Sequence, residues 1–186
     1  MLISETYRKL NHDLHTTHAG YGSHGGRYIS AILKLLAKYE ADSILDYGCG
    51  KGEFSRALKY RSKIKRLEYD PAIRGKESAS PADLVIALDV MEHIEPEYLT
   101  DVIQHIHGLT GKCFYCSIAT RPSKKMLADG RNAHLIVQPG TWWLSQLYPF
   151  FSIIVFAERE DKLQYTFECV PRKAKANGTD QDIHRF

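Results

Sequence analysis

The sequence lacks any apolar run that approaches the roughly 18 residues needed for a membrane-spanning helix. Its N-terminus has no basic region followed by an apolar stretch, so we expect no signal peptide and a cytoplasmic protein. The formal net charge is only +3 over 186 residues, which is too small to require a polyanionic partner. Hydrophobic residues make up 44% and charged residues 25%, as in ordinary globular proteins. This length and composition fit one folded domain without a membrane partner.

Cysteine is scarce, with four residues in the whole chain. Cys113 and Cys116 form a C-x-x-C, a spacing found in redox and zinc sites. They lie in a segment that reads as a strand, where residues three apart point to opposite faces. A zinc site also needs a second close pair, which Cys49 and Cys169 do not supply. We therefore assign no redox or zinc chemistry to the cysteines.

Apolar periodicity predicts helices and strands that alternate along most of the chain. Helices are expected at about 27–39, from 52, from 95 and near 141–147, with Thr141 as the cap of the last one. Strands are expected at 43–47, 64–69, 83–88, 113–118, 151–157 and 163–170. The alternation predicts an α/β fold with a Rossmann-like, doubly wound, mostly parallel sheet, closed by an antiparallel C-terminal hairpin.

We expect a single domain over residues 1–186, made of an N-terminal flap (1–26), a core (27–171) and a polar tail (172–186). Within the flap, His12, His15 and His18 repeat at every third residue. On a helix they would share one side and could bind a metal or a substrate, but we favour a solvated flap over the pocket.

A glycine-rich turn at residues 46–52 follows the first expected strand and leads into a helix. Glycines at 48, 50 and 52 bring bare backbone close to a ligand. A dinucleotide fingerprint would have glycine where Glu53 stands, and a phosphate-binding P-loop would have Ser or Thr where Gly52 stands. The turn therefore suits a cofactor without a phosphate, and the carboxylate of Asp46 suits an ammonium group. Asp70, at the end of the second strand, is placed to accept both hydroxyls of a ribose.

These motifs resemble those of class I S-adenosylmethionine-dependent methyltransferases. Residues 44–52, 68–71 and 82–94 look like the first, second and fourth motifs of that superfamily. The segment 129–136, together with Trp142 and Trp143, resembles small methyltransferase-like proteins of phages and prophages. The resemblance implies methyl transfer from S-adenosylmethionine to a nitrogen or oxygen of a small molecule or nucleic acid. Two alternatives remain: another enzyme that cleaves this cofactor or transfers a different group from it, and a non-catalytic nucleoside-binding module.

By this resemblance, Asp46 and Gly48 lie near the methionine part of the cofactor, Gly50 lies against it, and Asp70 holds the ribose. The expected cofactor site comprises Asp46, Tyr47, Gly48, Gly50, Asp70, Pro71, Asp89 and Val90.

One departure from the family concerns the segment between the second and fourth motifs. The family normally has a helix and a third strand there, with an acid near the strand end that contacts adenine. Only residues 71–82 intervene in this chain, which is too short for a helix and a strand together. We therefore predict a truncated third-strand edge and recognition of adenine by apolar contacts and backbone.

Methyl transfer requires an aligned nucleophile and sometimes a base that removes its proton. We expect Glu92, His93 and His134 above the strand ends, and we favour His134 as general base or substrate contact. A loop histidine bonded only to backbone is an equal alternative. With Asp89, this set is also similar to the metal-binding Glu-x-x-Glu-His…His set of small-RNA 2′-O-methyltransferases, which would hold magnesium or manganese. Glu-His after this strand is common in methyltransferases without metal, so we assign no metal ligand.

The long polar segment of residues 119–140 carries four cations against one acid, Asp129: Arg121, Lys124, Lys125 and Arg131. If it borders the pocket, it would attract an anionic substrate such as a nucleotide, a nucleic acid or a phosphorylated metabolite. A solvated loop is the alternative. We predict Arg121, Arg131 and Tyr21 as substrate contacts, in a monomer or a homodimer.

Overall fold

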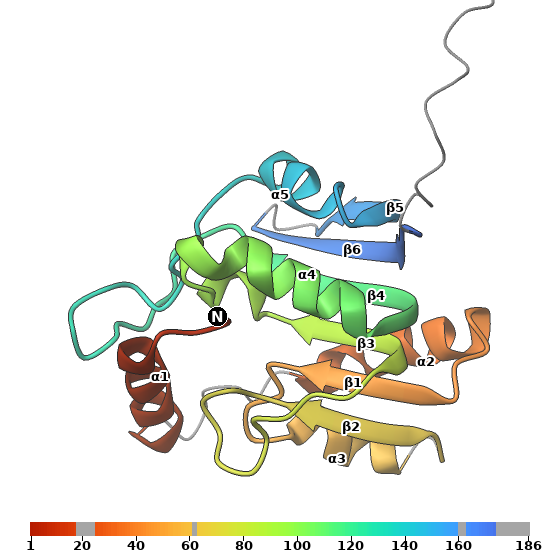
Figure 1. Ribbon diagram of the computed structural model, residues 1–186, viewed down its shortest axis with the longest axis horizontal. Coiled ribbons are helices and arrows are strands. Elements are labelled where there is room, and N and C mark those ends of the chain that lie inside the picture. The colour runs from red at the N-terminus through yellow and green to blue at the C-terminus, as the bar shows by residue number, and fades with distance from the viewer. Residues whose placement is uncertain (18–24, 61–62, 160–162, 174–186) are drawn as a thin grey trace, which may run out of the picture.

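The computed structural model describes residues 1–17, 25–60, 63–159 and 163–173, which form a six-stranded sheet with helices on both faces (Figure 1). The strands are β1 (Ser43–Tyr47), β2 (Lys65–Tyr69), β3 (Ala82–Leu88), β4 (Thr110–Ala119), β5 (Phe151–Glu158) and β6 (Gln164–Pro171). The helices are α1 (Glu5–Thr17), α2 (Ile29–Lys38), α3 (Glu53–Lys59), α4 (Leu99–Leu109) and α5 (Gly140–Leu147). Short 3₁₀ turns lie at Gly25–Tyr28, Met91–His93 and Pro96–Tyr98.

The strand order is β2-β1-β3-β4-β6-β5. β1 pairs in parallel with β2 and β3, and β3 pairs in parallel with β4. β6 runs antiparallel to both β4 and β5, so the last two strands form a hairpin at the edge of the sheet. The predicted mostly parallel sheet with an antiparallel C-terminal hairpin is confirmed.

The other edge of the sheet is β2, as predicted from the short segment that follows it. Residues 70–81 connect β2 to β3 without a helix or a strand. The segment turns back toward the glycine turn, where the ammonium of Lys76 pairs with Glu68 at 2.8 Å and donates to the carbonyl of Gly50 at 3.1 Å. The truncated edge is thus fixed by polar contacts to the site that it borders.

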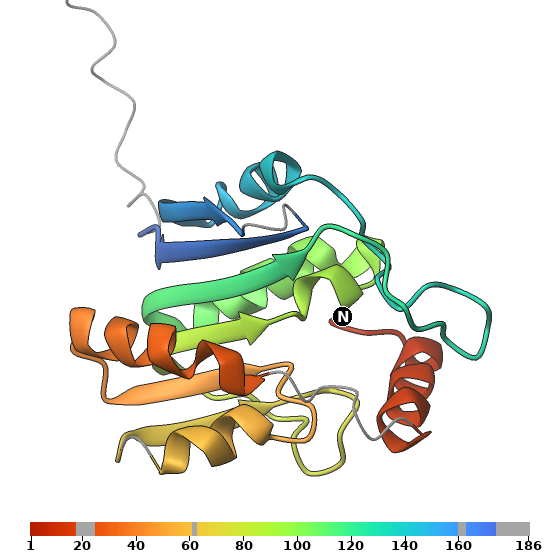
Figure 2. The same cartoon turned by 180° about the vertical axis from the view of Figure 1, so that it is seen from behind.

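Each face of the sheet has its own apolar core. α4 and α5 cover one face, which Figure 1 shows toward the viewer, and α2 and α3 cover the other, which Figure 2 shows. Cys113 belongs to the α2/α3 side and Cys116 to the α4/α5 side, as expected for strand residues three apart. All four cysteines are buried and unpaired.

The apolar stripe of α4 explains how this helix packs on the sheet. Its five buried side chains recur at helical spacing, so they share one face: Leu99, Val102, Ile103, Ile106 and Leu109. The prediction that Thr141 caps α5 is wrong. Pro139 holds the cap position and Gly140 is the first helical residue. A Cβ at Gly140 would lie 2.6 Å from the ring of Tyr165, so the close packing there requires glycine.

α1 and the segment that follows β4 lie beyond the carboxyl ends of β1 and β3, away from the rest of the core (Figures 1 and 2). Tyr7 and Leu14 of α1 pack with Leu127 and Ala133 in a small third cluster. The expected N-terminal flap therefore contains a helix that packs on the long polar segment. No helix in the described part of the chain is long and apolar enough to cross a membrane.

Candidate active site

A cavity of about 430 Å³ opens at the carboxyl ends of the parallel strands. Its walls are the glycine turn after β1, the ends of β2, β3 and β4, α1, and the segment that follows β4. The volume lies within the range of small-molecule sites, and open α/β sheets bind ligands at this edge. The cavity is therefore the place where the predicted site residues should meet.

The glycine turn forms the floor of the cavity by adopting a backbone that other residues rarely adopt. Gly48, Gly50 and Gly52 have φ angles of 73°, 48° and 73°. A Cβ at position 48 would lie 2.6 Å from both methyl groups of Val90. The N–H of Gly48 also donates to the carbonyl of Tyr69 at 2.7 Å, which ties the turn to the end of β2. The turn is close-packed on its protein side, so glycine is required at position 48.

Asp46 lines the cavity at the end of β1 while being only 4% exposed. Burial, reinforced by the nearby charge of Glu68, raises the pKa of Asp46 to about 7. The electrostatic attraction between a buried carboxylate and a cationic partner is stronger than that of an exposed pair, because little water screens it. This position therefore suits a cationic group of a ligand.

Asp70 also lines the cavity, but it has a structural task as well. Its two carboxylate oxygens accept N–H bonds from Gly50 and Ala72, each at 2.9 Å. Each oxygen keeps a further acceptor site, so the carboxylate can brace the glycine turn and still receive a hydroxyl. Pro71 borders the cavity beside it, whereas Gly50 lies behind the lining.

Tyr47 and Val90 border the cavity as predicted, with Tyr47 turned toward α4. The ring of Tyr47 packs on Tyr69 with centroids 4.7 Å apart, and its hydroxyl meets Nδ1 of His105 at 3.0 Å. The side chain of Tyr47 is therefore committed to the core on the α4 face, and that of Val90 packs against Gly48.

Asp89 lines the cavity at a left-handed backbone position with φ of 56°. Its carboxylate accepts hydrogen bonds from Ser117 at 2.8 Å and from the hydroxyl of Tyr28 at 3.1 Å. It also contacts the side chains of Arg27 and Gln164. Asp89 is thus the centre of a network that joins β3, β4, β6 and the 3₁₀ turn before α2.

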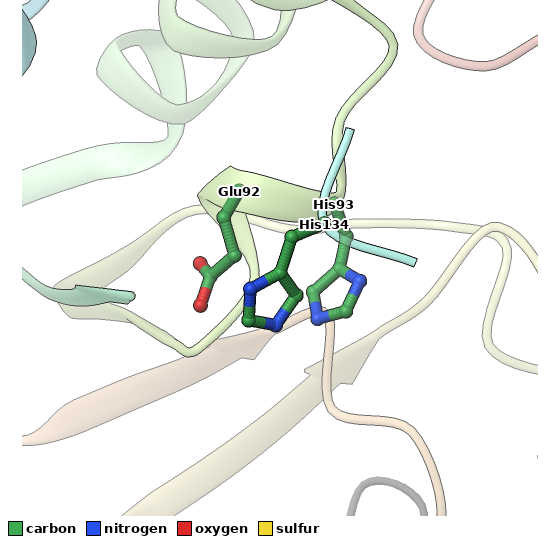
Figure 3. A group of neighbouring side chains, drawn as sticks. All are labelled: Glu92, His93 and His134. Carbon is green, nitrogen blue, oxygen red and sulfur yellow. The ribbon is translucent and has the colours of Figure 1, made fainter. Parts of the chain in front are cut away.

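Glu92, His93 and His134 lie on the cavity wall above the strand ends, where they were expected, and their side chains come together there (Figure 3). One side-chain ligand atom from each residue lies within 4.8 Å of the other two. The two imidazole rings meet edge to face, with centroids 4.8 Å apart and planes at 89°. A loop far along the chain thus completes a cluster that the end of β3 begins.

Backbone carbonyls fix the orientation of both imidazoles. Nδ1 of His93 lies 2.7 Å from the carbonyl of Ala133, and Nδ1 of His134 lies 2.6 Å from the carbonyl of Arg121. Since a carbonyl can only accept, each Nδ1 carries the proton and each neutral ring presents a lone pair at Nε2. Burial lowers the pKa of His93 to about 3 and also lowers the pKa of His134. Both rings are therefore neutral at neutral pH.

Glu92 is fully buried, and one of its two carboxyl oxygens has a hydrogen-bond partner among the described residues. Oε1 accepts the backbone N–H of Ala119 at 2.9 Å, but Oε2 meets no hydrogen-bond partner among the described residues. Burial, with a further contribution from the charge of Asp89, raises the pKa of Glu92 to about 8. A buried oxygen without a partner is costly, and such groups often mark a ligand site.

The cations of the long segment divide between the cavity and the surface. Arg121, Lys124 and Lys125 line the cavity. Arg131 pairs with Asp129 at 2.8 Å and lies outside the lining, so the structure does not bring this predicted substrate contact into the site. Tyr21, the third predicted contact, lies outside the described residues.

Residues 21–158, most of the chain, match a family model described as a methyltransferase domain. The chain belongs to this methyltransferase family. No curated protein matches it significantly.

Solved structures similar to this methyltransferase share its fold at low sequence identity. The 1,6-didemethyltoxoflavin-N1-methyltransferase of Burkholderia thailandensis, solved with 1,6-didemethyltoxoflavin and S-adenosylhomocysteine, is 15% identical, with a TM-score of 0.61 over 93% of this chain and 92% of that one. DhpI in complex with S-adenosylhomocysteine is 12% identical, with a TM-score of 0.62 over 91% and 98% of the two chains. Magnesium protoporphyrin IX methyltransferase of Synechocystis PCC 6803, also with S-adenosylhomocysteine, is 16% identical, with a TM-score of 0.53 over 79% and 83%. Family and fold together confirm the predicted enzyme class, an S-adenosylmethionine-dependent methyltransferase.

The methyltransferase site also contains residues that the sequence analysis missed, most of them on α1. Tyr7 and Asn11 line the cavity, and the hydroxyl of Tyr7 donates to the carbonyl of His93 at 2.6 Å. His15, one of the three histidines noted in the sequence, lines the cavity beside them. At the start of α1, Ser4 donates to the buried carboxylate of Glu95 through its N–H at 2.8 Å and its hydroxyl at 2.6 Å. The histidine spacing was one signal in the sequence that α1 is a helix, and a serine before it, whose hydroxyl accepts the N–H of Tyr7 at 3.1 Å, was another. Nothing in it indicated which residues α1 would contact.

Proposed function

We propose that the cavity binds S-adenosylmethionine and that the enzyme transfers its methyl group to a nitrogen or oxygen atom of a small molecule or nucleic acid. One observation carries this proposal: a buried carboxylate, Asp46, lines the cavity beside a glycine turn that leaves no room for a Cβ at position 48. A cationic ligand that lies close against backbone fits this arrangement, and the family membership supports a methyl donor.

The residues present fit the cofactor. When bound, S-adenosylmethionine supplies a methyl group activated by its sulfonium. Asp46 would pair with the ammonium of the methionine part, and the bare backbone of Gly48 would lie against the same part. Asp70 would receive the ribose hydroxyls on the acceptor sites that its bonds to backbone leave open. Gly50, Tyr47, Pro71, Asp89 and Val90 complete the proposed cofactor site by shaping its floor and walls.

Catalysis in this proposal falls to the cluster of Glu92, His93 and His134. His134 is the proposed general base, because its Nδ1–H is held by a carbonyl and its lowered pKa keeps Nε2 unprotonated at neutral pH. His93 and Glu92 would contact and orient the acceptor. All three residues border the cavity.

Charge favours an acceptor that carries a negative group. Three cations line the cavity on the side of the long segment: Arg121, Lys124 and Lys125. A nucleotide, a nucleic acid or a phosphorylated metabolite would be attracted to this wall. Arg131 and Tyr21 remain proposed substrate contacts. Residues 1–186 are proposed to act as one domain, in a monomer or homodimer, and the similarity to small phage proteins is kept as a hypothesis.

Isothermal titration with S-adenosylmethionine and S-adenosylhomocysteine tests cofactor binding directly. Gly48→Ala should abolish binding, whereas Gly108→Ala, at a position where a Cβ meets nothing within 4 Å, should leave it intact. If the unmodified protein binds neither ligand, the proposed function is refuted.

The acceptor can be found by incubation with methyl-labelled cofactor and separate pools of DNA, RNA, protein and metabolites. Transfer of label to one pool would identify the acceptor class. Loss of label to a by-product without any acceptor would instead favour an enzyme that cleaves the cofactor. If the protein binds S-adenosylmethionine but transfers no label in any pool, a nucleoside-binding module would be favoured.

A further inference from the structure

We propose that Glu92, His93 and His134 form a binding site for a divalent transition-metal ion on the wall of the cavity. The three side chains point into one region, with the ring of His134 between Glu92 and His93 (Figure 3). One ligand atom of each lies within 4.8 Å of the other two. Ligands at about 2.0–2.1 Å from a tetrahedral ion lie about 3.4 Å from one another, so binding would draw the side chains together by up to about 1.4 Å.

The hydrogen bonds of the imidazoles are those of metal-ligating histidines. Such histidines donate one ring N–H to a carbonyl or carboxylate, which fixes the tautomer and directs the other nitrogen to the metal. His93 and His134 both do this, through Nδ1 to the carbonyls of Ala133 and Arg121. Each ring thus offers Nε2 in the neutral form that a metal requires.

Glu92 supplies the third ligand and the charge that a cation requires. Its Oε1 is held by the N–H of Ala119 at 2.9 Å, and its buried Oε2 has no partner among the described residues. A metal bound to Oε2 would satisfy this oxygen and stabilise the ionised form of the carboxyl group. A carboxylate held on one oxygen by a backbone donor and open on the other is well suited to such a role.

Asp89 does not belong to the cluster, so the metal would have no second carboxylate ligand. Hydrogen bonds from Tyr28 and Ser117, together with contacts to Arg27 and Gln164, hold its carboxylate elsewhere. The protein therefore offers two imidazoles and one carboxylate. This set favours Zn²⁺, Co²⁺, Mn²⁺ or Fe²⁺ over Mg²⁺, which prefers oxygen ligands and keeps its waters.

Three protein ligands leave at least one coordination position, and the ligands border the cavity. With the ion bound, Nε2 of His134 would be a ligand instead of the general base. An oxygen of the methyl acceptor could then occupy the open position, and the ion would orient it and lower the pKa of its hydroxyl group. This role rests on the proposed function and would narrow the acceptor to an oxygen compound. The metal site itself rests only on the geometry of the cluster.

The test is a titration of the metal-free full-length protein with Co²⁺, followed by visible absorption, and with Zn²⁺, followed by calorimetry. We expect one ion per chain, d–d absorption bands of a low-coordinate site, and much weaker binding of Mg²⁺. Glu92→Gln and His134→Ala should each weaken binding at least about tenfold, since even partners of metal ligands cost 10–100-fold when removed. His107→Ala is the matched control, because it removes an imidazole that bonds a carbonyl outside the cluster.

Each outcome decides the proposal. Absence of Co²⁺ bands in the wild-type protein overturns it, even if the variants fail to fold. Binding that survives in both folded variants also overturns it and indicates other histidines, such as those near the N-terminus. Metal binding without binding of S-adenosylmethionine would support the metal site and refute only the proposed function. Binding of S-adenosylmethionine without binding of metal would refute only the metal site.

Discussion

The ionisation of Asp46 should make the affinity for S-adenosylmethionine depend on pH. Burial raises the pKa of this carboxyl group to about 7 in the free protein, and pairing with the ammonium of the cofactor requires the ionised form. At pH 6 about one-tenth of the free protein has Asp46 ionised, and at pH 8 about nine-tenths does. Affinity should therefore rise about tenfold between pH 6 and pH 8, equivalent to about 1.4 kcal/mol.

Isothermal titration at pH 6, 7 and 8 measures this dependence, with Asp46→Asn as the comparison. The amide keeps the size of the side chain but cannot ionise. It should remove the component of the pH dependence that Asp46 causes and weaken binding at pH 8 by about 10- to 100-fold, the value of one charge-assisted hydrogen bond. Adenosine, which lacks the methionine part, should bind both proteins alike. Equal pH profiles for the wild type and Asp46→Asn would refute the assigned role of Asp46.

Three further predictions concern stability. Because the pKa of Asp46 is raised on folding, stability should fall as pH rises from about 4 to 7, so Asp46→Asn should raise the free energy of unfolding at pH 8 by up to about 4 kcal/mol in thermal or denaturant unfolding. Gly48→Ala should lower the free energy of unfolding by about 1–3 kcal/mol, because the Cβ would clash with Val90. Gly108→Ala in α4 should instead raise it by up to about 1 kcal/mol, and equal effects of the two variants would contradict the strain at Gly48. Trp143→Ala should cost about 3–5 kcal/mol, since this side chain is fully buried, and a cost no greater than that of Trp142→Ala would contradict the packing.

The two tryptophans of α5 show what the spacing of apolar residues on a helix can and cannot predict. The sequence places both on one short helix but does not indicate which of them is buried. In the structure, Trp143 is fully buried, and Trp142 is half-buried against it at a ring distance of 5.0 Å. Sequence spacing on a short helix indicates which residues share a face, but only packing decides which of them is covered.

The catalytic cluster was predicted only as a set of candidates above the strand ends. Glu92 and His93 were expected there because they follow β3, and this holds for any parallel sheet. His134 arrives on a segment without periodicity, so its position depends on side-chain and backbone contacts made far along the chain. Its bond to the carbonyl of Arg121 and the separate engagement of Asp89 carry no signature in the sequence.

The sequence by itself determined the sheet and the glycine turn. Strands and turns are encoded by neighbouring residues: apolar runs, glycines at fixed positions, and the short segment 71–82 that leaves no room for a third strand. Tertiary structure alone decided which residues of α1 line the cavity, that Asp89 is held by four side chains, and that Glu92, His93 and His134 meet. The physical reason is the separation along the chain of the residues that interact. Local patterns fix backbone conformation, whereas a site depends on side chains that folding brings together from distant parts of the chain.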